Sequence, residues 1–393
     1  MLINLRNALM TRKRLPYDAK VEYIESTGTQ YLETGVYATE NTRVNATLMT
    51  ISTGNRNWFG GSIAGSAERS NGFVFNSYSS SRVEYLFGGG RGWSTVPVTN
   101  AVGRVFTLDF SKGGVVIDGT TVATPSYTSF AQNTGQICIC VRYRNSGYIS
   151  GRIYAFRIYE GATLVRDFIP VRVGQVGYLY DRVSGALFGN AGTGDFVLGP
   201  DVVSVEYIES TGTQYIDTGV TATGATNSEF QFKMSVTGFA FGARTAWNEV
   251  GYSLNYATGN YAFNYGNTSS VAALRSTIPV DTNWHTAKIL SGGVLSLDAW
   301  TNTVGSYSFT TSDNLILFGT RQGSLLNRTA SGFKYCKIWE SSTPVLDYVP
   351  VRVGSGSTWE GAMMDVLTRR IYRNQGTGAF GYGGDLPLET LAN

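Results

Sequence analysis

The feature that most limits the fold of this chain is a long segment that occurs twice. VEYIESTGTQYLETGVYAT at Val21–Thr39 returns as VEYIESTGTQYIDTGVTAT at Val205–Thr223, with 16 of 19 positions identical at an offset of 184 residues. Repetition at a fixed offset is the sequence signature of a duplicated structural unit. We therefore expect two tandem copies of one domain, each opening with this segment.

Two further pairs of matching segments lie near the ends of the copies. DFIPVRVG at Asp167–Gly174 matches DYVPVRVG at Asp347–Gly354, and NAGTG at Asn190–Gly194 corresponds to NQGTG at Asn374–Gly378. Copy 2 is four residues longer after the first of these pairs, which predicts a loop at about residues 355–361. The interiors of the copies differ almost completely. The matching ends predict a shared frame, and the differing interiors predict strands and loops that carry binding specificity.

Composition predicts β structure throughout both copies. Charged residues make up 15% of the chain, and it contains 48 Gly, 24 Tyr and 20 Phe. Glycine permits the positive φ of tight turns, and aromatic and β-branched residues suit a pleated, half-buried surface. Strand signals at Gly151–Tyr159 and Phe333–Trp339, and turn-then-strand signals at Gly113–Gly119 and Gly292–Asp298, have the short spacing typical of sandwiches and jelly rolls. The expected fold class is all-β, with two tandem antiparallel β-sandwich domains of the jelly-roll kind.

We place an N-terminal arm at residues 1–17, the two domains at 18–201 and 202–386, and a C-terminal tail at 387–393. The net charge is +3, and residues 1–20 alone carry +4. About ten residues cannot form a stable helix alone in water, so the amphipathic arm needs a surface to lie against. That surface is either domain 1 or another molecule, and the residues expected to dock are Leu2, Leu5, Arg6, Leu9, Arg12, Lys13 and Arg14.

Charge, hydropathy and cysteine spacing exclude several classes of protein. The body has no basic stripe with interleaved aromatic residues, so we expect no nucleic-acid partner. No apolar run reaches 18 residues, so we expect no membrane span. Arg6 interrupts the N-terminal apolar run, which argues against a secretory signal peptide. Cys138, Cys140 and Cys336 lack the spacing of a disulfide framework and are expected to be small buried residues.

Several of these segments resemble a known superfamily. The opening EYIESTGTQY, the GRIYAFRIYEGATLVRDFIPVR segment at Gly151–Arg172 and the closing LYDRVSGALFGNAGTGDFVLGPD segment at Leu179–Asp201 are similar to the concanavalin A-like lectin/glucanase superfamily. The LamG-like jelly rolls of gut bacteria and their phages are the nearest type. Asn283-Trp284-His285 also resembles a stretch of LamG domains, which copy 1 keeps only as Arg104-Val105-Phe106. The basic arm followed directly by EYIESTGTQY looks like the start of phage structural proteins.

The resemblance raises one enzymatic alternative, because some members of the superfamily cleave β-glucans. That hydrolysis needs two carboxylates that flank the scissile bond. The E-x-D-x-E triplet of the glucanases is absent, and the spacing of Glu22 and Glu25 puts them on opposite faces of a strand, as in copy 2. His285 is the only histidine, which excludes a histidine-rich metal site, and we expect its ring to stack in a sheet beside Trp284. We therefore expect no enzymatic activity.

Calcium is a weaker alternative that the LamG-like resemblance suggests, and no other cofactor is expected. Asp181 and Asp365 recur at equivalent positions, with Asn190 and Asn374 after them, and their oxygens are of the type that binds calcium. The same residues commonly stabilise turns through hydrogen bonds to backbone amides. The matching segments also predict two structural charge pairs, Asp167 with Arg172 and Asp347 with Arg352.

Sugar recognition uses flat aromatic faces beside directional polar groups. The divergent interiors contain several such combinations. The candidate glycan contacts are Arg56, Trp58, Arg91, Trp93, Arg142 and Tyr143 in copy 1, and Arg244, Trp247, Asn248, Tyr252 and Tyr256 in copy 2. The alternative is that most of these side chains belong to the core, which a sandwich of this size needs in quantity.

These observations and the resemblance together predict a non-enzymatic, virion-associated structural protein of a phage, either a decoration protein or a fibre-like component. The arm would attach to capsid or fibre subunits, and the two lectin-like domains would face outward and bind host or environmental glycans. Such a protein is made in the host cytoplasm without a signal peptide and is oligomeric or particle-bound. The alternatives are a bacterial surface adhesin that binds carbohydrate and a glycoside hydrolase.

Overall fold

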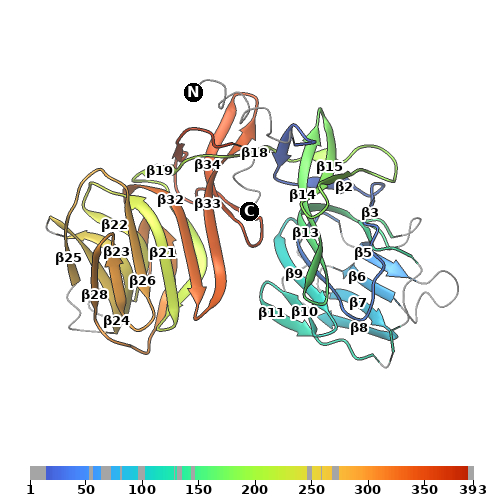
Figure 1. Ribbon diagram of the computed structural model, residues 1–393, viewed down its shortest axis with the longest axis horizontal. Coiled ribbons are helices and arrows are strands. Elements are labelled where there is room, and N and C mark those ends of the chain that lie inside the picture. The colour runs from blue at the N-terminus through green and yellow to red at the C-terminus, as the bar shows by residue number, and fades with distance from the viewer. Residues whose placement is uncertain are drawn as a thin grey trace, which may run out of the picture. The chain divides into compact units, whose positions relative to one another are not determined.

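The computed structural model divides the chain into two compact units, Met1–Asp201 and Val202–Asn393, which we call domain 1 and domain 2 (Figure 1). Residues in the described parts form strands, turns and irregular segments but no helix, so none of them forms an apolar helix that could cross a membrane. The described residues are 15–52, 56–62, 72–79, 82–95, 102–127, 129–130, 135–142, 147–245, 250–257, 259–267 and 274–387.

One sheet of domain 1 is built around the long strand β13 (Ser150–Glu160). β4 (Thr42–Thr50) pairs along one edge of β13, while β2 (Ile24–Thr27) and β14 (Thr163–Val173) share the other edge. The remaining strands of this sheet in domain 1 are β1 (Ala19–Val21), β9 (Val105–Ser111), β10 (Gly114–Ile117), β11 (Thr120–Ala123), β15 (Val176–Asp181), β16 (Ala186–Phe188) and β17 (Val197–Leu198).

A second sheet faces the first, and the core of domain 1 lies between them. Its strands run in the order β3 (Leu32–Glu33), β12 (Cys138–Ile139), β5 (Arg56–Ser62), β6 (Gly72–Ser79), β7 (Arg82–Gly88) and β8 (Gly90–Thr95). Alternation along β9 turns Phe106, Leu108 and Phe110 inward. The ring of Phe110 lies 4.8 Å from that of Phe73 on the opposite sheet, measured between centroids. Apolar side chains of both sheets therefore form one continuous core.

Domain 2 repeats this plan with other residues. β32 (Ala330–Glu340) pairs with β21 (Thr226–Lys233) on one edge and with β19 (Ile208–Thr211) and β33 (Thr343–Ser355) on the other. The same sheet holds β18 (Asp201–Ser204), β26 (His285–Leu290), β27 (Val294–Leu297), β28 (Trp300–Thr303), β34 (Thr358–Asp365), β35 (Ile371–Tyr372) and β36 (Gly381–Tyr382). The facing sheet holds β20 (Ile216–Thr223), β22 (Gly238–Arg244), β23 (Val250–Ala257), β24 (Asn260–Asn267), β25 (Leu274–Pro279), β29 (Thr310–Leu317), β30 (Gly319–Gln322) and β31 (Leu325–Arg328).

The two domains are therefore all-β sandwiches, as predicted. Their central strands have the same register, because Ile153 of β13 lies opposite Ile24 and Phe333 of β32 lies opposite Ile208. The four predicted strand segments correspond to β10, β13, β27 and β32. Strands β22 and β30 pair in parallel, whereas the pairs around β13 and β32 are antiparallel.

The opening and closing segments of each copy are similar because they bind each other. In domain 1 the side-chain amide of Gln30 donates to the carbonyl oxygen of Asp195 at 3.0 Å. The backbone amide of Tyr31 donates to Asn190 Oδ1 at 3.1 Å. The equivalent bonds in domain 2 are 3.1 Å and 3.1 Å long. Each segment needs the other to satisfy its polar groups, so both copies retained them.

The four additional residues of copy 2 do not form the predicted loop. They extend the hairpin of β33 and β34 by two further pairs, Gly354 with Trp359 and Ser355 with Thr358. In domain 1 the corresponding hairpin ends at the pair Val173 with Val176. An even insertion keeps the alternation of side chains in register, so the extra residues continue both strands before the turn.

The described end of the N-terminal arm packs on domain 1. Tyr17 is 7% exposed, and its ring lies 5.0 Å from that of Tyr180. It forms a small apolar cluster with Ile169 and Val171, against which Leu15 also packs. Tyr17 therefore anchors the arm where it enters the domain.

Candidate functional site

The aromatic residues predicted to contact glycans do not form a common site. Trp58 and Tyr252 are fully buried, so the prediction that they contact a ligand is wrong. Trp58 packs edge-on against Phe106, with 6.4 Å between ring centroids, and its indole nitrogen donates to Thr50 Oγ1 at 3.3 Å. The Tyr252 hydroxyl donates to the carbonyl oxygen of Ile289 at 2.8 Å. Both rings are needed to fill the space between two sheets.

The other candidates are divided between the core, its margin and the surface. Arg244 is buried with its guanidinium 5.7 Å from the Phe239 ring, and this burial lowers its pKa. Tyr256 packs half-buried against the core of domain 2, Arg142 is half-buried and Arg56 is exposed. Outside the described part of the chain lie residues 1–14 of the arm, Tyr143, Trp247 and Asn248, and the side chains of Arg91 and Trp93.

Asp181 and Asp365 stabilise turns and are not arranged as metal ligands. Asp181 Oδ1 accepts hydrogen bonds from the backbone amides of Asp167 at 2.9 Å and Val183 at 3.1 Å, and Oδ2 accepts from the Ser184 hydroxyl at 2.6 Å. Asp365 makes the equivalent three contacts in domain 2. Donor hydrogens occupy the positions that a cation would need. The calcium alternative is wrong at these two aspartates, and no cluster of three metal-binding side chains occurs within the described ranges.

The recurring arginines pair with the end of each copy and not with the predicted aspartates. Arg172 contacts both carboxylate oxygens of Asp201 at 2.7 Å. Arg352 contacts those of Asp385 at 2.6 and 2.7 Å. Five positions separate Asp167 from Arg172, so the alternation of β14 directs their side chains to opposite faces of the sheet. Both predicted charge pairs are therefore wrong for the same geometric reason.

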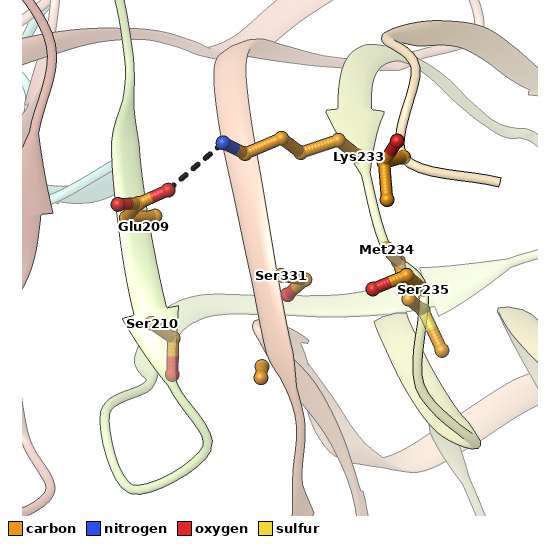
Figure 2. Close-up of a pocket in the computed structure, with 8 residues that line it drawn as sticks. Glu209, Ser210, Lys233, Met234, Ser235 and Ser331 are labelled. Carbon is orange, nitrogen blue, oxygen red and sulfur yellow. Dashed lines mark ion pairs between the residues drawn. The ribbon is translucent and has the colours of Figure 1, made fainter.

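A hollow in domain 2 is the strongest candidate for a binding site. It lies where β19 and β21 end and β32 begins, and its volume is about 230 Å³. Figure 2 shows the Lys233 side chain extending toward Glu209, with the labelled serines Ser210, Ser235 and Ser331 below them. The lining residues, which we call the Glu209–Lys233 hollow, are Glu209, Ser210, Lys233, Met234, Ser235, Thr282, Ala330 and Ser331.

The ammonium group of Lys233 links the hollow to two half-buried aromatic rings. Lys233 Nζ lies 2.9 Å from Glu209 Oε2, 4.6 Å from the centroid of the Tyr207 ring and 5.2 Å from that of Trp284. The two rings are 5.3 Å apart, and Lys334 Nζ lies 4.8 Å from the Trp284 ring. Attraction to a carboxylate and to two aromatic faces positions the Lys233 ammonium at the rim.

Local sequence alternation creates this arrangement. In β19 the side chains of Ile208 and Ser210 are buried, which leaves Glu209 on the outer face of the sheet. Lys233 lies opposite Gly332 of β32, also on the outer face. A Cβ atom at Gly332 would come within 2.9 Å of Lys233 Cε and 3.1 Å of the Trp284 ring. Glycine is therefore needed there for the lysine and the indole to lie against the sheet.

Domain 1 has the same chemistry at the same place, although the cation comes from another strand. Arg152 Nε lies 2.6 Å from Glu25 Oε2, and the guanidinium carbon is 4.1 Å from the Tyr23 ring. Tyr154 supplies the second ring, 5.5 Å from Tyr23. Arg152 occupies the position of Gly332, because Arg152 pairs with Glu25 and Gly332 pairs with the equivalent Glu209. Ring pair, cation and carboxylate are thus common to both domains.

The hollow in domain 2 lies where domain 1 has a large core residue. Trp58 of β5 and Ala240 of β22 are equivalent, because the next residues pair at the same register: Phe59 with Ile139 and Phe241 with Leu317. A Cβ atom at Gly151 would lie 2.3 Å from the Trp58 ring. Ser331 stands at the position of Gly151 and lines the hollow. Replacement of an indole by a methyl group therefore accompanies the opening of this region in domain 2.

His285 lies beside the loop that borders the hollow. Its Nδ1 is 2.7 Å from Asp298 Oδ2, and its Nε2 is 2.9 Å from Asp281 Oδ1. The ring packs against Tyr261, with 5.1 Å between centroids, and not against Trp284 as predicted from the sequence. The imidazole points inward from the first residue of β26 and the neighbouring indole points outward, as strand alternation requires.

The groups at the hollow suit hydrogen bonding to a polyhydroxyl ligand. Glu209 accepts, Lys233 donates, and the hydroxyls of the exposed Ser235 and Thr282 can do both, whereas those of Ser210 and Ser331 already donate within the protein. The volume is below the roughly 300–1,000 Å³ of sites for drug-sized molecules, which fits a ligand of one small ring at a time. Glu209 is the one carboxylate among the lining residues, whereas glycoside hydrolysis uses two.

Sequence reasoning missed the residues that form this site. Tyr207 and Glu209 belong to the most similar segment of the two copies, for which the sequence predicts a structural role, whereas it predicts binding specificity in the interiors. The signal was present in EYIES, where alternation places the tyrosine and the second glutamate on the outer face. Lys233 and Trp284 meet them only through sheet pairing, which no local pattern specifies.

The chain is structurally similar to several solved structures. No family model matches the sequence, and no curated protein matches it. The chain is similar to domains LG4-5 of the mouse laminin alpha1 chain, with 12% identity, 85% of this chain and 94% of that chain covered, and a TM-score of 0.29. It is also similar to the LG1-3 region of the laminin alpha2 chain (12% identity, 83% and 63% covered, TM-score 0.30) and to the NanB sialidase of Streptococcus pneumoniae (9%, 92% and 75%, TM-score 0.28). The assignment of two β-sandwiches rests on the sheets themselves.

Proposed function

We propose that this chain is a non-enzymatic carbohydrate-binding protein, and that one sugar unit is held in the Glu209–Lys233 hollow. The observation that carries the proposal is a small hollow lined by hydroxyl and charged groups, whose Lys233 also contacts a pair of half-buried rings. A sugar presents hydroxyl groups around an apolar ring of C–H bonds. It therefore needs directional polar partners together with aromatic surface, and both are within reach here.

The charges at the rim define the expected contacts. Glu209 is 41% exposed and Lys233 is 30% exposed, so both can exchange water for a ligand. The carboxylate can accept from two neighbouring hydroxyls while the ammonium donates to a third oxygen. Hydrogen bonds to charged groups contribute about 1.5–3 kcal/mol each, so a single one changes affinity by roughly 10- to 100-fold.

Exchange of residues between the two domains provides the test. Lys233→Met places in domain 2 the residue that domain 1 has at this position, Met49, and Glu209→Gln removes the charge while keeping the shape. A glycan array with the full chain identifies the ligand, and calorimetry then measures its affinity. We expect each variant to weaken binding at least tenfold, and the matched control Glu25→Gln in domain 1 to leave it unchanged. Absence of binding to any glycan, or equal binding by all variants, would refute the proposal.

The finer proposal is that the chain is a phage virion component attached through its N-terminal arm. Two things support it: the resemblance of the arm and its following segment to phage structural proteins, and the anchoring of the arm's end on domain 1 through Tyr17. Because Tyr17 fixes the end of the arm on domain 1, the docking residues before it extend from a defined position. Particles assembled with a chain that lacks residues 1–14 should not incorporate it, while both domains stay folded. Normal incorporation of the shortened chain would contradict attachment through the arm.

A further inference from the structure

The single imidazole of this chain is held between two carboxylates. Both ring nitrogens of His285 lie within hydrogen-bond distance of an aspartate oxygen. A neutral imidazole carries one N–H, so it can donate to only one of the two, whereas the imidazolium donates to both. Burial by itself would lower the pKa of His285, but the hydrogen bonds to Asp298 and Asp281 outweigh it and raise the pKa above its ordinary value.

Among the described residues, the two aspartates are the charged groups that act on the His285 ring. Phe232 and Tyr261 cover the ring, with 6.1 and 5.1 Å between centroids. Burial raises the pKa of Tyr261 to about 12, so its hydroxyl stays neutral over the range in which histidine titrates. Burial opposes ionisation of Asp281, but hydrogen bonds from Asn283 and His285 prevail and lower its pKa. The Asp281 carboxylate is therefore ionised near pH 7, both when the imidazole is neutral and when it is protonated.

The same contacts connect the histidine to the Glu209–Lys233 hollow. Asp281 is followed by Thr282, which lines the hollow, and by Trp284, whose ring lies 5.2 Å from Nζ of the lining residue Lys233. Within the described part of the chain, the other hydrogen bonds of the Asp281 side chain are local, to the backbone amide and side chain of Asn283, each 2.7 Å long. Among the described residues, the bond to His285 joins this carboxylate to the sheet, while the Asp281 carbonyl oxygen lies 3.5 Å from the Tyr261 hydroxyl. We call the three residues the Asp281–His285–Asp298 clip.

Domain 1 has a permanent cation where domain 2 has a titratable one. Asp118 and Asp298 are equivalent turn residues with φ of 47° and 50°, and each accepts a hydrogen bond from a threonine amide at 2.8 Å. In domain 1 the second carboxylate oxygen contacts Arg104 Nη2 at 2.6 Å. Arginine stays charged throughout the accessible pH range. The contact in domain 1 therefore keeps its charge at every accessible pH, whereas the contact in domain 2 carries a group that titrates near neutral pH.

We propose that His285 is the positioning residue of the hollow, and that its imidazolium holds Thr282 and Trp284 in place by linking Asp281 to Asp298. The inference rests on the proposed function and names how that site is regulated. A histidine with a raised pKa in the folded state contributes stabilisation that is complete below its ordinary pKa of about 6.5 and is lost as pH rises through the folded pKa. Ligand affinity therefore falls as the solution becomes alkaline.

A first experiment tests the clip without any ligand. Because the chain has one histidine, its nitrogen resonances can be followed by NMR from pH 5 to 9 without assignment. We expect a midpoint above about 6.5 and protons on both nitrogens below it. The indole N–H resonance of Trp284, identified with Trp284→Phe, should move with the same midpoint. A midpoint at or below the ordinary value, or an indole resonance that does not follow the imidazole, would overturn the inference.

A second experiment measures how the clip affects binding. With the glycan selected by the array, wild-type affinity should fall about fivefold between pH 6 and pH 9, the value of one neutral hydrogen bond of about 1 kcal/mol. His285→Phe, which places the domain 1 residue Phe106 at this position, should bind weakly and equally at both pH values. Asp281→Asn keeps the shape of the loop and should flatten the profile in a chain that melts normally. A pH profile shared by all three proteins would overturn the role of His285. Failure to find any glycan would count against the proposed function alone, because the NMR titration still decides the clip.

Discussion

Trp58→Ala measures how far the core of domain 1 depends on the residue that domain 2 lacks. The indole is fully buried, lies edge-on to Phe106 and donates to Thr50 Oγ1. Truncation of a buried tryptophan to alanine costs about 3–5 kcal/mol, because the transfer energy is lost and a cavity remains. The hydrogen bond is long, so its share is at the low end of about 0.5–1.5 kcal/mol. We expect a loss of about 4 kcal/mol in the free energy of unfolding of domain 1.

Urea unfolding of the full chain, followed by far-ultraviolet circular dichroism, gives this value if the two domains unfold in separate transitions. For a domain of this size 1 kcal/mol corresponds to about 2–4 °C in Tm, so the domain 1 transition should also move down by about 8–16 °C. Trp58→Phe is the matched control, because it keeps most of the ring volume and should cost less than half as much. A loss below about 1 kcal/mol, or an equal shift of the domain 2 transition, would refute the packing argument.

Two other predictions follow from buried polar groups. Asp181→Ala and Asp365→Ala each leave buried backbone amides without an acceptor, so each should destabilise its own domain by about 3–5 kcal/mol in thermal or urea unfolding, and calcium should not raise the Tm of the wild type. Unchanged stability of both variants would contradict the assignment to turns. Burial raises the pKa of the Cys140 and Cys336 thiols, so neither should react with a thiol reagent at pH 8 until the chain is unfolded; labelling of the folded chain would show that the strands open.

The duplicated fold was predictable because its signals are local and periodic. Turn glycines and alternating apolar residues identify β13 and β32 from the sequence, and a fixed offset identifies the two copies. The sequence predicts a loop where β33 and β34 form a longer hairpin, because a length difference alone does not say whether inserted residues pair. The core was also misjudged at Trp58 and Tyr252, because an aromatic residue in a divergent segment has the same sequence appearance whether it faces ligand or core.

The candidate site was not predictable because it depends on which strands become neighbours. Nothing near Glu209 in the sequence contains its cation, which comes from the end of β21. The same limit explains the failure with Arg172 and Arg352, whose partners lie at the closing end of each copy. Pairing register converts distant residues into contacts, and a period of two residues indicates only the face on which each one lies.

The cation beside the shared tyrosine and glutamate comes from different strands in the two domains, and this difference accompanies the hollow of domain 2. In domain 1 the long side chain is Arg152 and its neighbour across the ladder is Met49, whereas in domain 2 the long side chain is Lys233 and its neighbour is Gly332. Both solutions place a positive charge between the retained tyrosine and glutamate. The second also leaves a bare stretch of β32 on which Trp284 can lie, and it brings the ammonium to the end of a strand. Together with alanine in place of the indole at Ala240, these differences accompany the hollow, so interior residues of domain 2 meet the shared Tyr207 and Glu209 there.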